Sequence, residues 1–114
     1  MNNCIFCKII KNEIATNKVY EDDDILAFND INPKAPLHIL IIPKKHIPSL
    51  EYAKKEDIEV LGKMQIVAKE IAIKNGVIKD GVRLVLNCNK GAGQEVFHIH
   101  YHLLGGRTFT WPPG

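Results

Sequence analysis

The sequence lacks any long apolar run, which bears first on where the protein resides. No stretch approaches the roughly 18 apolar residues of a membrane-spanning helix, and the chain does not begin with a charged segment followed by an apolar one. We therefore expect a cytoplasmic protein with no membrane partner. Cysteine is also scarce, since three residues, an odd number, argue against a framework of disulfide bonds in such a protein.

The sequence also lacks an excess of charge of one sign. Its 15 basic and 13 acidic residues are well mixed and give a formal net charge of +2. There is no basic run and no stripe of alternating basic and aromatic residues, so we expect no nucleic-acid partner. The length of 114 residues predicts a single domain over 1–114, large enough to bury a core and small enough to gain stability from oligomerisation.

Histidine, by contrast, is concentrated in one short segment. Residues 97–104 read FHIHYHLL and place His98, His100 and His102 at alternate positions. In an extended strand these three imidazoles share one face, and apolar residues occupy the other. A hydrophobic core has no use for three titratable rings in a row, because each buried imidazole needs partners for two nitrogens. This face is therefore a candidate site.

From the residues alone, three interpretations of this face remain open. It is the solvated side of a half-buried strand, a metal site built from alternating histidines, or a site of nucleophilic or acid–base chemistry. The loop that precedes it, residues 90–94, is rich in glycine. Backbone N–H groups in such a loop can approach a phosphate closely because no Cβ is in the way. An anion cradle beside a row of imidazoles favours phosphorus chemistry.

Hydrophobic periodicity and turn signals predict the remaining elements. They are a short helix within 4–14, a hairpin over 18–29 with an acidic turn at 21–24, a loop over 29–36, a central strand over 37–42 ending at Pro43, a basic turn over 44–48, one long helix over 55–75 and a strand over 82–87. The short connections predict an antiparallel meander, and His38 within the central strand is expected to be structural. Trp111 and Phe109 are too apolar for water, so we expect this tail to pack on its own subunit or on a partner.

Cys4 and Cys7 form a CxxC pair close to the start of the sequence. A redox pair usually lies between a strand and a helix, and almost nothing precedes this one. One CxxC supplies only two of the four ligands of a zinc site, so the other two would have to come from elsewhere. A pair of small buried thiols is the alternative.

The alternating histidines carry the pattern of the histidine triad (HIT) family, His-φ-His-φ-His-φ-φ with φ apolar. Further segments resemble its Hint branch, the purine nucleoside phosphoramidases. These segments are Ile9-Ile10 with Glu13-Ile14, residues 20–23, 26–28 with 30–31, 42–47, Gly93-Gln94, 104–107 and the ending 111–114. The resemblance implies an α+β, HIT-like fold with a five-stranded antiparallel sheet, one long helix and one short helix. It also implies a homodimer whose two sheets join into one ten-stranded sheet.

The resemblance further implies hydrolysis of purine nucleoside 5′-phosphoramidates, adenosine or guanosine monophosphate linked to an amine, through a covalent nucleotidyl-histidine. The implied roles are His100 as nucleophile, His102 at the phosphate oxygens, His98 and His46 in the same hydrogen-bonded row, Asn87 with Gly93 and Gln94 at the phosphate, Asp30 at the ribose, Phe6, Ile9, Phe28 and Ile31 at the base, and Trp111 at the active site of the other subunit. No cofactor is needed for this route. Dinucleoside polyphosphate hydrolysis and a nucleotide-binding regulatory or scaffold role with vestigial turnover are the alternatives.

Two departures from the animal Hint proteins concern the site. Glu95 stands where those proteins carry a serine that contacts the phosphate, and a carboxylate there repels the anion unless it is protonated, turned away or beside the departing amine. We expect Glu95 to tune the rate or the leaving-group preference. The CxxC pair resembles zinc-binding bacterial members, in which the ligands correspond to Cys4, Cys7, His46 and His98. Two thiolates and two imidazoles suit a structural Zn²⁺, with the thiol pair as the alternative.

Overall fold

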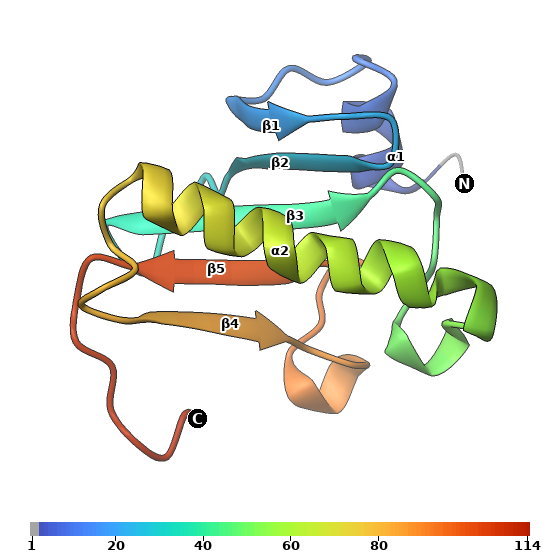
Figure 1. The fold of residues 1–114 in the computed structure, drawn as a ribbon. Coiled ribbons are helices and arrows are strands. Elements are labelled where there is room, and N and C mark those ends of the chain that lie inside the picture. Colours follow the sequence, from blue (N-terminus) through green and yellow to red (C-terminus); the bar gives the residue numbers. More distant parts are fainter. Residues whose placement is uncertain (1–2) are drawn as a thin grey trace.

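The computed structural model describes residues 3–114, so the first two residues of the opening segment considered above lie outside it. Its helices and strands, in chain order, are α1 (Ile5–Ile10), β1 (Lys18–Glu21), β2 (Ile25–Asn29), β3 (Leu37–Pro43), η1 (Leu50–Tyr52), η2 (Lys55–Asp57), α2 (Ile58–Lys74), β4 (Val82–Leu86), η3 (Lys90–Ala92) and β5 (Tyr101–Gly105). The five strands form one antiparallel sheet, and α2 lies across it (Figure 1). The predicted α+β fold is confirmed.

The expected simple meander is wrong, because the strands lie in the order β1-β2-β3-β5-β4. The long connection between β3 and β4 contains α2, which crosses the sheet (Figure 1). As a result β4 does not lie next to β3 but one strand position farther out. The last strand, β5, then returns between β3 and β4 and pairs with both. The strand that carries the histidines is therefore central and has a neighbour on each side.

Helix α2 packs on one face of the sheet through a stripe of residues spaced three or four apart, as its apolar periodicity predicts. The buried residues of this stripe are Met64, Val67, Ala68, Ile71 and Ala72. They contact side chains at alternate positions of the strands, among them Ile25, Ile39 and Leu103. The helix was predicted over 55–75, but its first turn is the tighter η2. There the Asp57 carboxylate accepts the Lys54 N–H at 2.9 Å and pairs with Lys45 at 2.7 Å.

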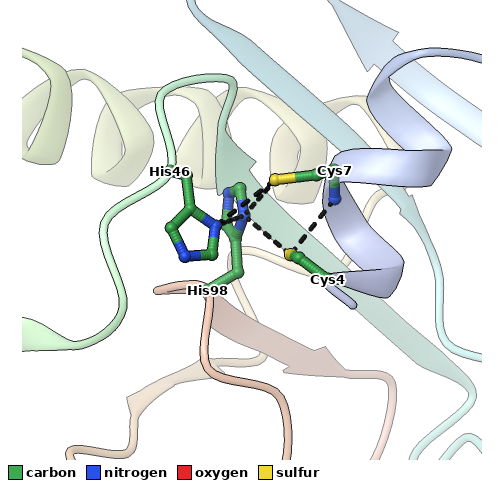
Figure 2. A group of neighbouring side chains, drawn as sticks. All are labelled: Cys4, Cys7, His46 and His98. Atoms are coloured by element: carbon green, nitrogen blue, oxygen red, sulfur yellow. Dashed lines mark hydrogen bonds between the residues drawn. The ribbon is translucent and has the colours of Figure 1, made fainter. Parts of the chain in front are cut away.

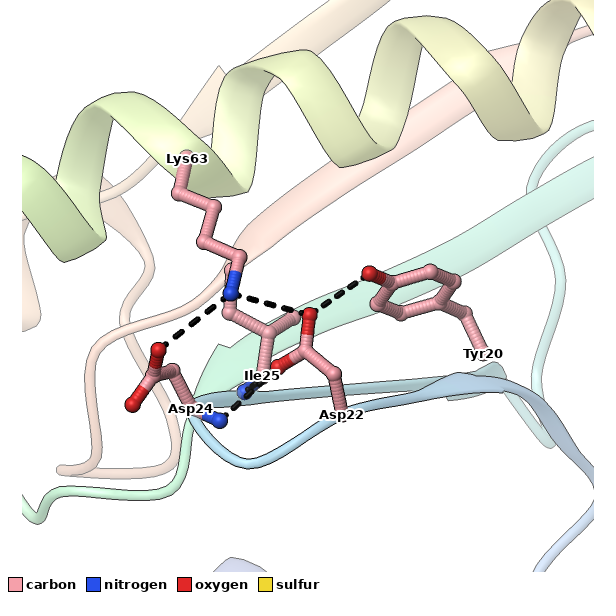
Figure 3. A network of polar contacts seen from close by, with 5 residues as sticks. All are labelled: Tyr20, Asp22, Asp24, Ile25 and Lys63. Carbon is pink, nitrogen blue, oxygen red and sulfur yellow. Dashed lines mark hydrogen bonds and ion pairs between the residues drawn. The ribbon is translucent and has the colours of Figure 1, made fainter.

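The turn between β1 and β2 ties this hairpin to α2 through Asp22 (Figure 3). The carboxylate of Asp22 accepts the N–H groups of Asp24 and Ile25 at 2.8 Å and the Tyr20 hydroxyl at 2.6 Å. Lys63 of α2 reaches the same carboxylate at 3.0 Å. Burial acts to raise the pKa of Asp22, but the hydrogen bonds from Tyr20, the two amides and Lys63 outweigh it and hold the pKa well below its usual range.

The opposite face of the sheet is covered by α1, which contributes Phe6 and Ile9. They pack on Leu26, Phe28, Leu40 and Ile42 from β2 and β3. The rings of Phe6 and Phe28 meet edge to face with centroids 5.5 Å apart. The described residues include no helix long and apolar enough to cross a membrane.

The C-terminal tail has no regular structure, as expected, and two arginines hold it. The guanidinium of Arg83 donates to the Thr110 carbonyl at 2.9 Å, and Arg107 lies 4.3 Å over the ring of Phe109. Phe109 thus packs on its own subunit, but Trp111 is 82% exposed. The tail was expected to pack on its own subunit or on a partner. Phe109 makes the first kind of contact, and contact of Trp111 with a partner stays a prediction.

Candidate active site

The strand predicted over 97–104 is shorter than expected, since regular pairing begins only at Tyr101. On the N-terminal side of Tyr101, β4 has ended at Leu86, and Pro43 at the end of β3 has no N–H to donate to a ladder. The N–H of Ile99 donates instead to the Ile47 carbonyl at 2.7 Å. The alternation survives this change, because Leu103 packs in the cluster under α2 while His98 and His100 contact Phe6 of α1.

The ring of His100 is held in one tautomer by its own backbone neighbour. Its Nδ1 lies 2.8 Å from the carbonyl oxygen of His98. A carbonyl can only accept, so Nδ1 carries the proton and Nε2 keeps a free lone pair. The edge of the ring meets Phe6 at a centroid distance of 5.1 Å, which fixes its plane. Burial lowers the pKa of His100, so that the ring is neutral at neutral pH.

His102 contacts a histidine that the sequence analysis set aside as structural, His38 of β3. Nε2 of His38 lies 2.9 Å from Nδ1 of His102, and the N–H of Lys34 donates to the other nitrogen of His38 at 3.0 Å. The register explains the contact, since His102 pairs with Leu40, two residues from His38 on the same face. Only this long-range register could have identified His38. Burial, with the nearby His100 and His38, lowers the pKa of His102 to about 4.

A cavity of about 510 Å³ opens beside His102, a size typical of small-molecule pockets. Its lining includes Asp30, Lys34, His38, Asn87, Glu95 and His102. The structure thus brings Asp30, expected at the ribose, to one cavity with Asn87 and His102, expected at the phosphate, whereas Gly93 and Gln94 are not part of its lining. Asp30, His38 and His102 also hold three potential metal-ligand atoms within 4.8 Å of one another. The 2.9 Å between the two ring nitrogens is nevertheless a hydrogen-bond distance.

The glycine-rich loop lies beside this cavity, but its amides are partly used within the loop. The N–H of Gly93 donates to Lys90 and that of Gln94 to Asn89, at 3.0 and 3.2 Å. Gly93 has a φ of +95°, a conformation that favours glycine, and a Cβ there would lie 3.9 Å from the Asn87 amide. For the N–H of Glu95, the residue after the loop, no acceptor is present among the described residues, so this amide is a candidate donor to an anion.

The side chain of Gln94 is buried and braces the loop instead of facing the cavity. Its Oε1 accepts the Asn89 N–H at 2.7 Å, and its Nε2 donates to the carbonyls of Pro48 and Val96 at 2.8 and 3.1 Å. Glu95, by contrast, is exposed and borders a second hollow of about 730 Å³, which His46 and Phe97 also line. Glu95 therefore stands between two hollows and its carboxylate is free to turn toward either.

Of the residues expected at the base, Phe6 contacts the ring of His100. Phe6, Ile9 and Phe28 are buried and form one apolar cluster, while Ile31 follows β2 and is 88% exposed. Phe6, Ile9 and Phe28 thus form an apolar wall, and Ile31 is the one residue of this set whose side chain is exposed. Trp111, expected at the site of the other subunit, lies on the exposed tail.

Cys4, Cys7, His46 and His98 converge on one point, although they come from α1, the segment after β3 and the segment before β5 (Figure 2). The Nε2–H of His98 donates to the Pro43 carbonyl at 2.7 Å, so its Nδ1 holds a lone pair. That Nδ1 lies 3.1 Å from Nδ1 of His46, 3.4 Å from Sγ of Cys4 and 3.6 Å from Sγ of Cys7. Burial and the neighbouring Cys4 raise the pKa of the Cys7 thiol to about 11.

These four donor atoms fit a tetrahedral zinc ion. With Zn–N of about 2.0 Å and Zn–S of about 2.3 Å, tetrahedral geometry places two nitrogens about 3.3 Å apart and a nitrogen and a sulfur about 3.5 Å apart. The N–N distance of 3.1 Å and the N–S distances of 3.3, 3.4 and 3.6 Å lie close to those edges, and all four donor atoms lie within 4.8 Å of one another. In addition, the Cys7 N–H donates to Sγ of Cys4 at 3.3 Å, a contact that stabilises a thiolate.

Comparisons with known proteins agree with this geometry. The family model described as "Scavenger mRNA decapping enzyme C-term binding" matches residues 3–109. A 14 kDa zinc-binding protein of Zea mays is 53% identical over 96% of this chain and 87% of its own length, and a purine nucleoside phosphoramidase of Escherichia coli K12 is 52% identical over 90% and 87%. The crystal structure of a HIT family hydrolase from Legionella pneumophila has a TM-score of 0.96 at 55% identity and covers 98% of this chain and 100% of that one.

Proposed function

Because this chain belongs to the histidine triad family of hydrolases, we propose that it hydrolyses purine nucleoside 5′-phosphoramidates through a nucleotidyl-histidine on His100. The observation that carries the proposal is the 2.8 Å contact between Nδ1 of His100 and the carbonyl of His98. It leaves the lone pair of Nε2 on a neutral ring free to attack phosphorus. The Escherichia coli relative, a purine nucleoside phosphoramidase, supports the choice of substrate class.

In the first step Nε2 of His100 attacks the phosphorus, and the P–N bond to the amine breaks. The amine nitrogen takes up a proton from solvent water and departs. A new P–N bond joins the nucleotide to Nε2 of His100, whose ring, still protonated at Nδ1, becomes an imidazolium. We assign to His102 and the amide of Glu95 the donation of hydrogen bonds to the phosphoryl oxygens, where negative charge increases in the transition state. The presence of both residues in the lining of one cavity supports this assignment.

In the second step water attacks the same phosphorus and the bond to His100 breaks. Nε2 of His100 keeps the electron pair of the broken bond, so the ring is neutral again and Nε2 regains its lone pair. The nucleoside monophosphate leaves as an anion, and the proton released by water balances the proton that the amine took up in the first step. The histidine thereby divides one difficult substitution into two easier ones. No metal ion takes part in either step.

The nucleotide is held by the residues around the cavity. The carboxylate of Asp30 accepts the ribose hydroxyls, and Asn87 contacts the phosphate. The purine lies on the apolar cluster of Phe6, Ile9 and Phe28, with Ile31 at its free edge. Because the contacts to the base are apolar, adenine and guanine both suit this wall.

The zinc site is part of the same proposal. The donor distances given above fit zinc, and the Zea mays relative is a zinc-binding protein. Cys4, Cys7, His46 and His98 would hold the ion, and a closed set of four protein ligands makes it structural. A reducing cytoplasm, where we place the protein, keeps both thiols available as ligands.

We also propose a homodimer. In the described residues β4 pairs with β5 on one side only, so its other edge has unpaired backbone groups. Pairing of two β4 edges would join the sheets of two subunits into one of ten strands. It would also provide a partner surface for the exposed Trp111.

Intact-protein mass spectrometry during turnover of adenosine 5′-phosphoramidate tests the mechanism. We expect a mass increase of one adenylyl group that maps to His100 and is absent from His100→Ala. That variant should lose turnover by at least about a thousandfold while it still binds AMP. Full turnover in His100→Ala would exclude the nucleophile, faster hydrolysis of diadenosine polyphosphates would favour the alternative substrate, and binding without turnover in the wild type would favour a scaffold role.

A further inference from the structure

The Gly-Gly-Arg segment at the end of β5, residues 105–107, has no part in the function proposed above. Its last residue, Arg107, follows β5 and reaches the loop between β2 and β3, residues 30–36. The Nε–H of its guanidinium donates to the carbonyl oxygen of Lys34 at 2.9 Å. Lys34 lines the same cavity as Asp30, the residue assigned to the ribose. Arg107 therefore joins the end of β5 to the loop that borders the nucleotide cavity.

The glycine before Arg107 allows this segment to pass close to the 30–36 loop. Gly106 has a φ of +88°, and a Cβ on it would lie 2.9 Å from the Cβ of Pro36. Two Cβ atoms do not approach so closely, so a larger residue would push the loop and the end of β5 apart. The packing of Gly106 on Pro36 and the hydrogen bond from Arg107 to Lys34 thus hold the loop together.

The guanidinium of Arg107 is itself held in place by the C-terminal tail. It lies 4.3 Å from the centroid of the Phe109 ring, and its Nη1 donates to the Thr108 carbonyl at 3.2 Å. Arg83 lies near the same ring at 5.2 Å and donates to the Thr110 carbonyl at 2.9 Å. Because a guanidinium is planar, contact with the ring fixes the direction of the Nε–H of Arg107.

The position of the 30–36 loop determines the position of the Asp30 carboxylate. Residues 31–34 are all exposed, so packing contributes little to their order. Oδ1 of Asp30 accepts the N–H of Asn32 at 2.8 Å, so the direction of the carboxylate follows the backbone of Asn32. A loop that moved at Lys34 would therefore displace Asn32, the Asp30 carboxylate and Ile31, which is assigned to the edge of the base.

The other hydrogen bonds of this loop tie it to β3 alone. The N–H groups of Asp30 and Lys34 donate to the carbonyl and the ring of His38, both at 3.0 Å. A loop held at one strand can pivot about that strand, whereas a second attachment to another strand prevents the pivot. The bond from Arg107, at the end of β5, provides this second attachment.

We propose that Arg107 is a positioning residue, which fixes the 30–36 loop so that the Asp30 carboxylate meets the ribose hydroxyls of the nucleotide. The proposal rests on the function given above, which assigns Asp30 to the ribose. Arg107 acts through the Lys34 carbonyl and does not touch the nucleotide. Such a support raises affinity because binding to a mobile carboxylate also costs the entropy of ordering it.

The test compares the binding of AMP with that of 2′,3′-dideoxy-AMP, which lacks both ribose hydroxyls, by isothermal titration calorimetry. The wild type should bind AMP at least about tenfold more tightly, because hydrogen bonds to a carboxylate are among the stronger ones. In Arg107→Lys and Arg107→Met this preference should fall to about threefold or less, while the affinity for 2′,3′-dideoxy-AMP stays within about twofold of wild type. Lysine keeps the charge but has no planar group to place an N–H at the Lys34 carbonyl.

Arg83→Lys is the matched control for these variants. Arg83 contacts the same ring and donates to the same tail, but its contacts among the described residues do not include the 30–36 loop. We expect this variant to keep the AMP preference of the wild type. An unchanged preference in both Arg107 variants, or a preference that falls equally in Arg83→Lys, overturns the proposal.

Backbone ¹⁵N relaxation of the free protein tests whether Arg107 acts through the loop. We expect the order parameters of Asn32 and Lys34 to fall in Arg107→Lys and to keep their wild-type values in Arg83→Lys. Unchanged order parameters in Arg107→Lys, together with a lost AMP preference, would contradict positioning by the loop.

These measurements also distinguish failure of this proposal from failure of the function on which it rests. An AMP preference that depends on Arg107, in a wild type that does not hydrolyse adenosine 5′-phosphoramidate, contradicts the proposed function and supports the role of Arg107. Hydrolysis with an AMP preference that is independent of Arg107 contradicts the role of Arg107 alone. Equal binding of both nucleotides by the wild type contradicts the ribose contact of Asp30 and, with it, this proposal.

Discussion

Replacement of Phe6 by alanine tests whether the apolar wall of α1 both stabilises the fold and positions the nucleophile. The ring is 5% exposed and meets Phe28 at 5.5 Å, His98 at 5.9 Å and His100 at 5.1 Å between centroids. Loss of a buried Phe side chain costs about 3–5 kcal/mol. Helix α1 has only six residues, so it can shift to close part of the gap. We therefore expect a loss of about 3 kcal/mol.

The assay is urea unfolding of wild type, Phe6→Ala and Phe6→Leu at neutral pH. Leucine retains most of the apolar volume and loses the edge-to-face contacts, which contribute about 0.5–1.5 kcal/mol per pair, so Phe6→Leu should lose about 1–2 kcal/mol. Because His100 loses the ring that fixes its plane, kcat/KM of folded Phe6→Ala should also fall by about tenfold or more. A Phe6→Ala protein within 1 kcal/mol of the wild type, with unchanged kcat/KM, would refute this reasoning.

Four further predictions concern separate sites. Asp22→Asn should lower the free energy of unfolding by about 2 kcal/mol, since it removes the charged acceptor of Lys63 and Tyr20, and urea unfolding will measure it. Because the pKa of His102 is lowered from 6.5 to about 4 in the folded protein, the unfolded chain takes up a proton at this residue at a higher pH than the folded protein does. The free energy of unfolding should therefore be unaffected by His102 above pH 6.5 and should fall by up to about 3 kcal/mol as the pH approaches 4. Thermal unfolding measured at a series of pH values checks this. Cys4→Ala should abolish stoichiometric zinc binding, measured by elemental analysis, and should lower Tm. Equal and sub-stoichiometric zinc contents in wild type and variant would refute the proposed zinc site. Glu95→Ser should change kcat or the ranking of amine leaving groups, and identical kinetics across an amine series would count against a role for Glu95.

The local features of the fold were accessible from the sequence, whereas the order of the strands was not. Period-2 and period-3.6 patterns predicted the strands and α2, because side-chain alternation is a property of a few consecutive residues. The position of β5 between β3 and β4 depends on where the long connection through α2 returns, and no local pattern encodes that path. The expected meander failed for this reason.

The residues of the candidate site likewise fall into those that the sequence could identify and those that it could not. The alternation of His98, His100 and His102 pointed to a site directly, since a core has no use for three imidazoles. His38 was set aside because a lone histidine in an apolar strand gives no local signal, and only the β3–β5 register brings it to His102. The free N–H of Glu95 was equally hidden, because the hydrogen bonds of Gly93 and Gln94 depend on the folded loop.

His98 connects the Cys/His cluster to the nucleophile through a single residue. Its ring contributes a donor atom to the cluster, and its carbonyl oxygen accepts a hydrogen bond from Nδ1–H of His100. A substitution of His98 therefore affects both the Cys/His cluster and the hydrogen bond that orients His100. The loss of turnover in such a variant would overestimate the direct contribution of the His98 imidazole to catalysis. The effects on the cluster and on the nucleophile can be separated with variants of Cys4, which lies far in sequence from the segment that carries the triad. Variants at Cys4 change the metal environment and the 3.4 Å contact with the ring of His98, but they keep the His98 carbonyl that accepts the proton of His100 and the rings of His100 and His102.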